Sequence, residues 1–238
     1  MKPWTLAGTT AVLALMAANA ALAEVTPEDV WQNLQDFYQA SGNTVTTGSA
    51  ARDGDTLVIT DLKAAIDDNG TTGETLIPEI RLRDMGDGSV EVTLSDEVSF
   101  TTSTAAIDDA PALDTTGSMK MPGMTGIVSG TPEAMTYAFT APSTDIQIAF
   151  SEDQKPAGTV GILLSDMTST YALAGAADAP TLDGSFAAAS AALTLAVSGD
   201  DGSDVTGVLN AADLSAKMVG NFVGMEEDDL AVALSKGF

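Results

Sequence analysis

The side chains that enzymes most often use for nucleophilic and metal chemistry are missing from this sequence. It contains no histidine and no cysteine, so it offers no catalytic triad or cysteine–histidine dyad. Ordinary zinc, copper–imidazole and haem ligand sets are missing for the same reason. The sequence also has no glycine-rich loop of the kinds that bind phosphates. We therefore expect a protein that is not an enzyme and that holds no cofactor.

Carboxylates are the most abundant groups that remain, with 34 Asp and Glu residues in the chain. Two carboxyl groups that face each other across a cleft can hydrolyse a glycosidic bond. Abundance does not single out such a pair, and none of the acids stands in a recognisable motif. A carboxylate-based hydrolase is the least favoured of the functions that the sequence leaves open.

Acidic turns are candidate calcium sites, because such loops can supply several of the about six to eight oxygen ligands that calcium takes. The densest turn is the segment 200–204, in which Asp200, Asp201 and Asp204 are candidate ligands. Segments 67–70 and 84–88 are similar, but none of the three has EF-hand spacing. Ordinary turn formation is the alternative interpretation, since Asp, Asn and Gly are also the residues that best form turns.

Three methionines form the sharpest local pattern. Met119, Met121 and Met124 follow the spacing M-x-M-x-x-M, and soft thioether sulfurs suit Cu(I). No histidine or cysteine supports them as ligands. The alternative interpretation is that these flexible side chains fill irregular gaps in an apolar core.

Two arginines are candidate anion ligands. Arg81 and Arg83 alternate with Ile80 and Leu82, so they share one face of a predicted strand. The alternative is that they pair with Glu79, Glu91 or other acids across a hairpin, which is the common use of charged residues on a sheet surface.

The charge balance restricts the partners. The formal net charge is −25, and it becomes −26 for the chain from Glu24 because Lys2 is lost with the predicted leader. Nucleic acid needs a basic surface, so we expect no nucleic-acid partner. Anionic lipid surfaces are disfavoured for the same reason. The charge favours solubility and cationic partners.

The N-terminus has the order of a secretory signal peptide. Lys2 precedes an apolar run from Leu6 to Ala18, and Ala21-Leu22-Ala23 forms an A-x-A cleavage pattern. We expect cleavage after Ala23 and a periplasmic protein. The apolar run is too short to span a bilayer, and no later segment approaches the length needed. The compartment permits disulfides, but the absence of cysteine excludes them.

One helix is predicted directly after the leader. Thr26 is a good N-cap, Pro27 suits the first helical position, and Glu28 and Asp29 complement the helix dipole. An apolar stripe at helical spacing follows. The stripe comprises Val30, Leu34, Phe37 and Tyr38, and Ser41-Gly42 ends the helix.

The rest of the chain alternates between apolar and polar residues, with turn residues between the alternating segments. The predicted strands are Thr44–Ala50, Thr56–Ile66, Thr75–Arg83, Ser89–Phe100, Gly126–Ser129, Ala134–Thr140, Asp145–Phe150, Thr159–Leu164, Ser169–Ala174, Ser185–Val197, Val205–Leu209 and Leu214–Val219. We expect loops at Ala105–Gly123 and Ala174–Gly184, and a short helix in Met225–Phe238. The predicted fold is mainly β, an antiparallel sheet or sheets with one N-terminal helix packed on the sheet. Residues 24–238 form a single β-rich domain, which could divide near residues 105–123.

Four segments of the first hundred residues carry a resemblance to a known family. They are Val25–Trp31, Gly54–Leu57, Pro78–Asp84 and Gly86–Leu94. In these segments the chain resembles a family of secreted Gram-negative proteins known only as domain-of-unknown-function family 2125. The resemblance implies an envelope location and a β-rich fold, and it brings no catalytic residues. Members of the family tend to be longer, so the resemblance is compatible with a chain that continues beyond Phe238.

These observations favour a non-enzymatic periplasmic envelope protein that binds or scaffolds. Strands with few bulky residues are compatible with an apolar or lipid-like ligand, and an envelope lipid or protein is the expected partner. A calcium-stabilised, adhesion-like β module is the alternative.

Overall fold

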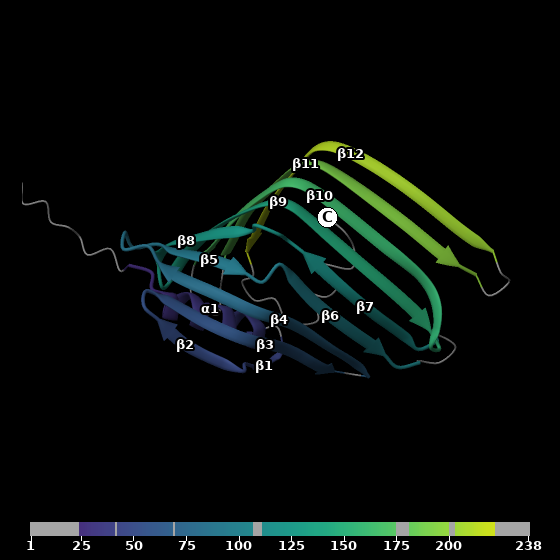
Figure 1. The fold of residues 1–238 in the computed structure, drawn as a ribbon, viewed down its shortest axis with the longest axis horizontal. Helices are drawn as coiled ribbons and strands as arrows, with labels where there is room; N and C mark the ends of the chain where they lie inside the picture. The colour runs from purple at the N-terminus through teal and green to yellow at the C-terminus, as the bar shows by residue number, and fades with distance from the viewer. Residues whose placement is uncertain are drawn as a thin grey trace, which may run out of the picture.

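The computed structural model describes residues 24–40, 42–68, 70–106, 111–174, 181–199 and 203–221. The predicted signal peptide and the helix predicted in Met225–Phe238 lie outside these residues. The described chain forms one helix and a single antiparallel sheet of twelve strands (Figure 1). The elements are α1 (Pro27–Ala40), β1 (Thr44–Thr46), β2 (Ser49–Asp53), β3 (Thr56–Asp68), β4 (Thr71–Asp84), β5 (Val90–Leu94), β6 (Glu97–Thr104), β7 (Leu113–Lys120), β8 (Thr125–Thr131), β9 (Ala134–Glu152), β10 (Lys155–Ala174), β11 (Thr181–Ser198) and β12 (Asp204–Asn221). The prediction of a mainly β fold with an N-terminal helix on the sheet is confirmed.

The helix begins as its sequence predicts. The Thr26 backbone N–H donates to Asp29 Oδ2 at 2.9 Å, and the Asp29 N–H donates to Thr26 Oγ1 at 3.2 Å. This reciprocal cap satisfies two backbone donors at the start of α1. Glu28, in the first turn, accepts hydrogen bonds from Arg52 on β2, and these lower the pKa of the Glu28 carboxyl. The cap and the ion pair fix the end of the helix against the edge of the sheet.

The apolar stripe of α1 is confirmed at three of its four positions. Val30 is buried, and Leu34 and Tyr38 pack against the hydrophobic core together with the neighbouring Trp31. Phe37 was wrongly placed on the buried face, because 57% of it is exposed. Its ring lies edge-on to Tyr38, with 5.8 Å between the ring centroids. Position 37 lies at the edge of the stripe, about 60° round the helix from Leu34 and about 100° from Tyr38, so its side chain is only partly covered.

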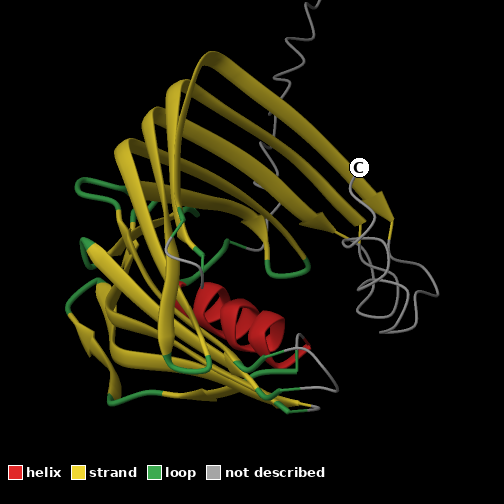
Figure 2. Ribbon diagram, turned by 90° about the vertical axis from the view of Figure 1, so that its right-hand side faces the viewer, coloured by secondary structure: helices red, strands yellow, loops and turns green. Residues whose placement is uncertain are grey.

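The sheet is bent along one line, which we call the crease. Six long strands cross it without interruption: β3, β4, β9, β10, β11 and β12. Elsewhere two strands meet end to end at the crease, as β1 and β2, β5 and β6, and β7 and β8 do. We call the half that contains β2, β5 and β8 arm 1, and the half that contains β1, β6 and β7 arm 2. Helix α1 lies on the concave side of the bent sheet (Figure 2).

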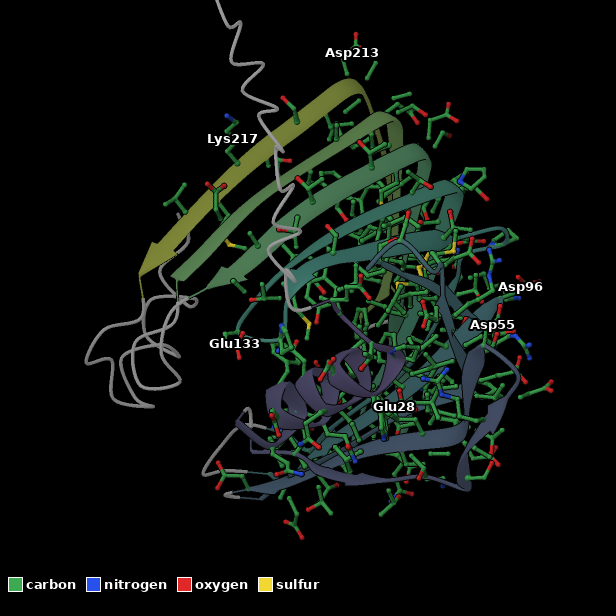
Figure 3. The ribbon with its side chains drawn as sticks, turned by 90° about the vertical axis from the view of Figure 1, so that its left-hand side faces the viewer. Glu28, Asp55, Asp96, Glu133, Asp213 and Lys217 are labelled. Carbon is green, nitrogen blue, oxygen red and sulfur yellow. The ribbon has the colours of Figure 1, made fainter. Side chains whose placement is uncertain are left out.

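Aspartate and proline make the crease. Asp61, Asp166 and Asp213 have positive φ angles of 50°, 48° and 53° within their strands. Aspartate enters the left-handed region more readily than most residues. The strand registers place Pro78 opposite Asp61 and Pro142 opposite Asp166. Asp213 lies at the top of the bend in β12 (Figure 3).

The crease changes which residues face inward. Ile59 and Leu62 of β3 are both fully buried although they are three residues apart. In an uninterrupted strand, residues three apart lie on opposite faces. The same three-residue step separates Ile77 from Ile80 in β4 and Ala141 from Thr144 in β9, and all four are buried. Both arms therefore turn their apolar residues toward the concave side.

Backbone hydrogen bonds close the crease where the strands are interrupted. The Ser95 N–H donates to the Glu79 carbonyl, and the Met121 N–H donates to the Asp96 carbonyl. At the far edge, the Gly48 N–H donates to the Thr60 carbonyl. A Cβ on Gly48 would lie 2.7 Å from Asp61 Oδ2, so the Asp61 carboxylate would have to shift to make room for it.

The crease also explains where the strand predictions failed. Ala134–Thr140 and Asp145–Phe150 are halves of β9, and the two predicted strands on either side of Asp166 are halves of β10. Val205–Leu209 and Leu214–Val219 likewise belong to β12. Proline and aspartate were read as turns, because a bend inside a strand uses the same residues.

The loop predicted over Ala105–Gly123 is wrong for residues 113–120, which form β7 between β6 and β9. Gly117 weakens the apolar alternation by which a strand is recognised in the sequence. The structure needs glycine there, because a Cβ would overlap the ring of Phe100 on β6. An aromatic side chain on the neighbouring strand thus supplies the bulk that β7 lacks. The strands on either side of this segment belong to one sheet.

The core lies between α1 and the concave side of the sheet. Its largest fully buried side chains include Ile59, Leu62, Ile80, Val90 and Val128. No helix in the described part of the chain is both long and apolar enough to cross a membrane.

The crease predicts opposite effects of glycine at two nearby exposed positions of β10. Asp166→Gly should keep or raise the free energy of unfolding, because glycine removes the cost of the left-handed conformation. Asp166→Val should lower it by about 1–2 kcal/mol. Thr168→Gly, at an ordinary strand position, should lower it by roughly 0.5–1 kcal/mol. Urea denaturation of the three variants measures these changes. Equal destabilisation by both glycines would contradict this account of the bend.

Candidate functional site

On the concave side of arm 2, apolar residues that lie opposite one another on adjacent strands form rows across the sheet. These rows begin in the core and continue beyond it. One row runs through Val98, Met119, Ile146, Ile162, Leu193 and Leu209, from β6 to β12. The next runs through Phe100, Gly117, Ile148, Val160, Leu195 and Gly207, and a third ends in Phe150, Gly158, Val197 and Val205. Val98 is a buried core residue, and Met119 packs against the core. The first row is therefore on the concave side.

The opposite face of arm 2 is largely polar. Its residues occupy the strand positions that alternate with those of the apolar rows. They include Ser99, Ser118, Gln147 and Thr194 at one level, and Thr101, Thr116, Thr159 and Thr206 at the next. The apolar residues of this outer face include Leu163 and Val208, with 46% and 70% exposed, and the small side chains of Ala149, Ala192 and Ala196. The two faces differ in character, as expected for a sheet with one apolar side.

Coverage of the apolar rows decreases steadily toward β12. Ile146 and Ile162 are half-buried, whereas Leu193 is 37% exposed and Leu209 is 63% exposed. In the adjacent rows, Leu195 is 38% and Val205 is 60% exposed. Helix α1 contacts mainly β1, β3 and β4, and Tyr137 in arm 1 of β9 donates a hydrogen bond to it. The rows on β10–β12 thus extend past the helix.

We call these residues the arm-2 apolar face. It comprises Ile146, Ile148, Phe150, Val160, Ile162, Leu193, Leu195, Val197, Val205 and Leu209. Four strands spaced by about 4.8 Å make it about 14 Å wide, and three rows make it about 13 Å long. The face covers roughly 180 Å², and exposed apolar residues that lie side by side can form an interaction site.

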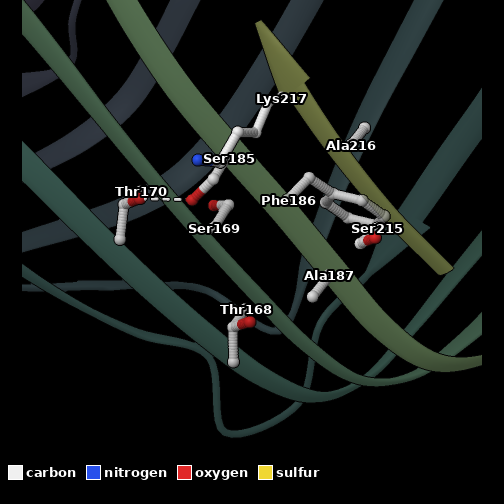
Figure 4. Close-up of a pocket in the computed structure, with 9 residues that line it drawn as sticks. All are labelled: Thr168, Ser169, Thr170, Ser185, Phe186, Ala187, Ser215, Ala216 and Lys217. Carbon is white, nitrogen blue, oxygen red and sulfur yellow. Dashed lines mark hydrogen bonds between the residues drawn. The ribbon is translucent and has the colours of Figure 1, made fainter. Parts of the chain in front are cut away.

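Two shallow hollows lie on the described surface, and the lining of the second includes Phe150 of the arm-2 apolar face. One, of about 390 Å³, is lined by residues of β10, β11 and β12 in arm 1, and most of these residues alternate to the outer face (Figure 4). The Thr170 and Ser185 hydroxyls are hydrogen-bonded there at 2.6 Å, and Lys217 lies beside them. The other, of about 380 Å³, includes Asp114, Thr116 and Thr159. Neither combines an enclosed shape with converging reactive groups.

An aromatic stack separates the helix from arm 1 of β9 and β10. The Tyr137 and Tyr171 rings are stacked with centroids 4.6 Å apart, and Phe139 stacks beside Tyr171. Tyr137 Oη donates to Asn33 Oδ1 on α1 at 2.5 Å. Burial raises the pKa of all three tyrosines, and it raises that of Tyr171 to about 12, with a smaller contribution from Tyr38. The fold therefore keeps these phenols protonated to a higher pH than free tyrosine.

The two candidate anion ligands are already engaged with acids. Arg83 donates from Nε to Glu91 Oε2 across the hairpin at 2.9 Å, and its Nη2 lies 2.8 Å from the same oxygen. Arg81 Nη1 lies 3.7 Å from Glu79 Oε1. Both guanidinium groups are on the outer face of β4, where they serve the surface pairing that the sequence left as the alternative.

The three methionines lie at or beside the crease. Met121 and Met124, between β7 and β8, are buried in the core, and Met119 packs against it. They occupy the place where two strands meet end to end, which is an irregular space of the kind methionine fills.

The acidic turns use their oxygens locally. Asp84 Oδ1 accepts the Gly86 N–H, and Asp87 Oδ1 accepts both the N–H and the hydroxyl of Ser89. The bonds from Ser89 lower the pKa of Asp87. Asp204 begins β12, whereas Asp200 and Asp201 lie outside the described residues. Among the described residues, no group of three or more acids is placed to hold a metal ion.

Comparison with known proteins adds no relative: no family model, no curated protein and no solved structure matches the chain.

The sequence reasoning missed the arm-2 apolar face. Its strands on β9–β11 were predicted, and the alternation of Leu193, Leu195 and Val197 was visible. The sequence does not tell which face of each segment points to the concave side. The crease shifts the side-chain alternation by one residue, so the two halves of a strand cannot be assigned to a face from alternation alone. The chemical candidates drew on composition, whereas the surface that stands out here depends on packing.

Burial of tyrosine predicts a loss of stability at alkaline pH. A tyrosine whose pKa is raised in the folded state contributes its full stability below the unfolded value of about 10. For Tyr171 this contribution should be lost as the pH rises from about 10 to about 12. Tyr171→Phe should therefore show a shallower fall of unfolding free energy over that range. Phe139→Leu, which alters the same stack without an ionisable group, should keep the wild-type slope. Identical slopes for wild type and Tyr171→Phe would exclude this linkage.

Proposed function

We propose that this protein is a non-catalytic binding protein of the periplasm and that it holds an extended apolar ligand, such as the acyl chain of a lipid, on the arm-2 apolar face. The observation that carries the proposal is the continuation of core rows onto β10–β12, where Leu193, Leu195 and Leu209 are more than a third exposed. Keeping such residues in water is unfavourable, so a ligand that covers them gains free energy.

The size of this gain favours an extended ligand. Each buried methylene contributes about 0.8 kcal/mol, whereas association costs at least about 4 kcal/mol in lost freedom. A ligand with fewer than about five methylenes would not offset that cost. A long alkyl chain would offset that cost. It could lie between the first row, which contains Ile162, and the second row, which contains Leu195.

The charge of the protein bears on the polar end of the ligand. A chain with a net charge of −25 repels anionic groups. An uncharged or zwitterionic head group is therefore the better match.

The cellular location and the family are part of the same proposal. The leader pattern that ends at Ala23 supports the periplasm, and the absence of histidine and cysteine supports a role without catalysis. The segments that resemble family 2125 lie at the start of α1 and in arm 1 of β3, β4 and β5. Membership of that family stays a prediction.

Binding can be tested with the neutral probe N-phenyl-1-naphthylamine, which fluoresces in apolar surroundings. Dodecyl maltoside below its micellar concentration should displace the probe, and maltose should not. The double variant Leu193→Glu, Leu195→Glu should weaken probe binding about tenfold or more, because it places charges on the apolar face. Thr194→Glu lies between them on the outer face and should bind as the wild type does.

Circular dichroism and urea denaturation should show that the variants remain folded. Equal binding by the double variant and by Thr194→Glu would contradict the proposed site. Displacement by maltose would show that the probe does not report on an alkyl chain.

A further inference from the structure

The two edges of the sheet are protected very differently. At one edge stand β1 and β2, with three and five residues, and α1 is tied to β2 by the Arg52–Glu28 pair. At the other edge stands β12, with 18 residues, no proline and one lysine (Figure 1). Its free edge has no strand partner in the described part of the chain. Natural proteins usually shorten, charge or cover such an edge.

The half of β12 in arm 2 is the less protected half. Lys217, the lysine of this strand, lies in arm 1 (Figure 3). From Val205 to Asn210 the strand has no charged residue. Val205, Val208 and Leu209 are each at least 60% exposed. In the part of the chain that the structure describes, the apolar rows of arm 2 thus stop at an unpaired strand edge instead of ending in polar residues.

We infer that a second copy of this chain pairs with β12 through residues 204–210, antiparallel, with Gly207 on the two-fold axis. In such a pair the residue on the axis faces itself, and residues equally far from it on either side face each other. Val205 then lies opposite Leu209 of the second copy, and this contact occurs twice. On the outer face, Thr206 lies opposite Val208, and Asp204 lies opposite Asn210, so no like charges meet.

The crease excludes a symmetric pair along the whole strand. In a two-fold antiparallel pair, opposite residues share a face only if the alternation is uninterrupted. Asp213 interrupts it: Leu214 and Ala211 both belong to concave-side rows although they are three residues apart. A pair centred at the crease would set concave-side residues of one copy against outer-face residues of the other. Pairing is therefore confined to one arm.

Within arm 2, the Gly207 register brings together more large apolar side chains than the register centred on Val208 does. Moving the axis to Val208 would place Leu209 opposite Gly207 and Val205 opposite Ala211, which leaves less apolar contact. The Gly207 register also continues the concave-side rows from one copy to the next. The net charge of −25 on each chain opposes association, so added salt should strengthen the dimer by screening this repulsion.

The absence of cysteine allows a direct test of the register. Opposite residues of an antiparallel pair have Cα atoms about 4.5–5.5 Å apart, within the range of about 4.4–6.8 Å that a disulfide spans. Gly207→Cys in the full chain should therefore give a covalent dimer under mild oxidation on a non-reducing gel. Two controls should stay monomeric on that gel: Thr194→Cys, on the outer face of β11, and Asp213→Cys, at the crease. Equal cross-linking of Thr194→Cys and Gly207→Cys would overturn the inference.

Sedimentation velocity provides a measurement without cysteine. The wild-type chain should show a dimer whose fraction rises between 20 and 500 mM sodium chloride, conditions we choose for the test. Leu209→Lys should abolish it, because two lysines would lie beside the paired strands. Val219→Lys, on the arm-1 half of the same strand, should leave it unchanged. A wild-type monomer at every salt concentration, or equal effects of the two lysines, would overturn the inference. The readout is mass, so it is independent of the ligand proposal.

Discussion

The shift in side-chain alternation at the crease is the constraint on which the rest of this structure depends. Ile59 and Leu62 can both be buried only because Asp61, between them, takes a left-handed conformation. The same device recurs at Asp166 and Asp213, with proline opposite the bend at positions 78 and 142. Without it, regular alternation would turn the apolar residues of one arm to the outside. The bend therefore makes a single sheet with one apolar side out of these long strands.

The position of α1 then decides which part of that apolar side is covered. Contacts with β1, β3 and β4 and the hydrogen bond from Tyr137 of β9 to Asn33 hold the helix on this part of the sheet. The rows on β10–β12 continue beyond it, and their exposure rises to 63% at Leu209. The proposed ligand site and the proposed pairing edge are two consequences of this one fact. The first concerns the face that the helix leaves uncovered, and the second concerns the edge at which the same rows end.

Local chemistry was predictable wherever neighbouring residues decide it. The helix start at Thr26-Pro27, the turn at Asp84–Gly88 and the ordinary pairing of Arg83 with Glu91 all follow from residues close in sequence or across one hairpin. The predictions failed where the same local residues are compatible with two different conformations of the chain. Pro142 and Asp166 indicate a turn as readily as a bend, and β7 was missed because the bulk opposite Gly117 comes from Phe100 on another strand. Phe37 shows the same limit in a helix, since periodicity does not say how wide the covered stripe is.

The sequence by itself determined the chemistry that this chain lacks, its strong negative charge, the start of its helix and the predominance of strands. These depend on composition and on contacts between near neighbours. Only the tertiary structure decided that Asp61, Asp166 and Asp213 lie within strands, and that Met121 and Met124 fill the core at the crease. It also decided that the apolar rows of β10–β12 extend past α1. The physical reason is that a side chain's alternation gives only a choice of two faces, and the face that becomes the inside is fixed by what packs against it.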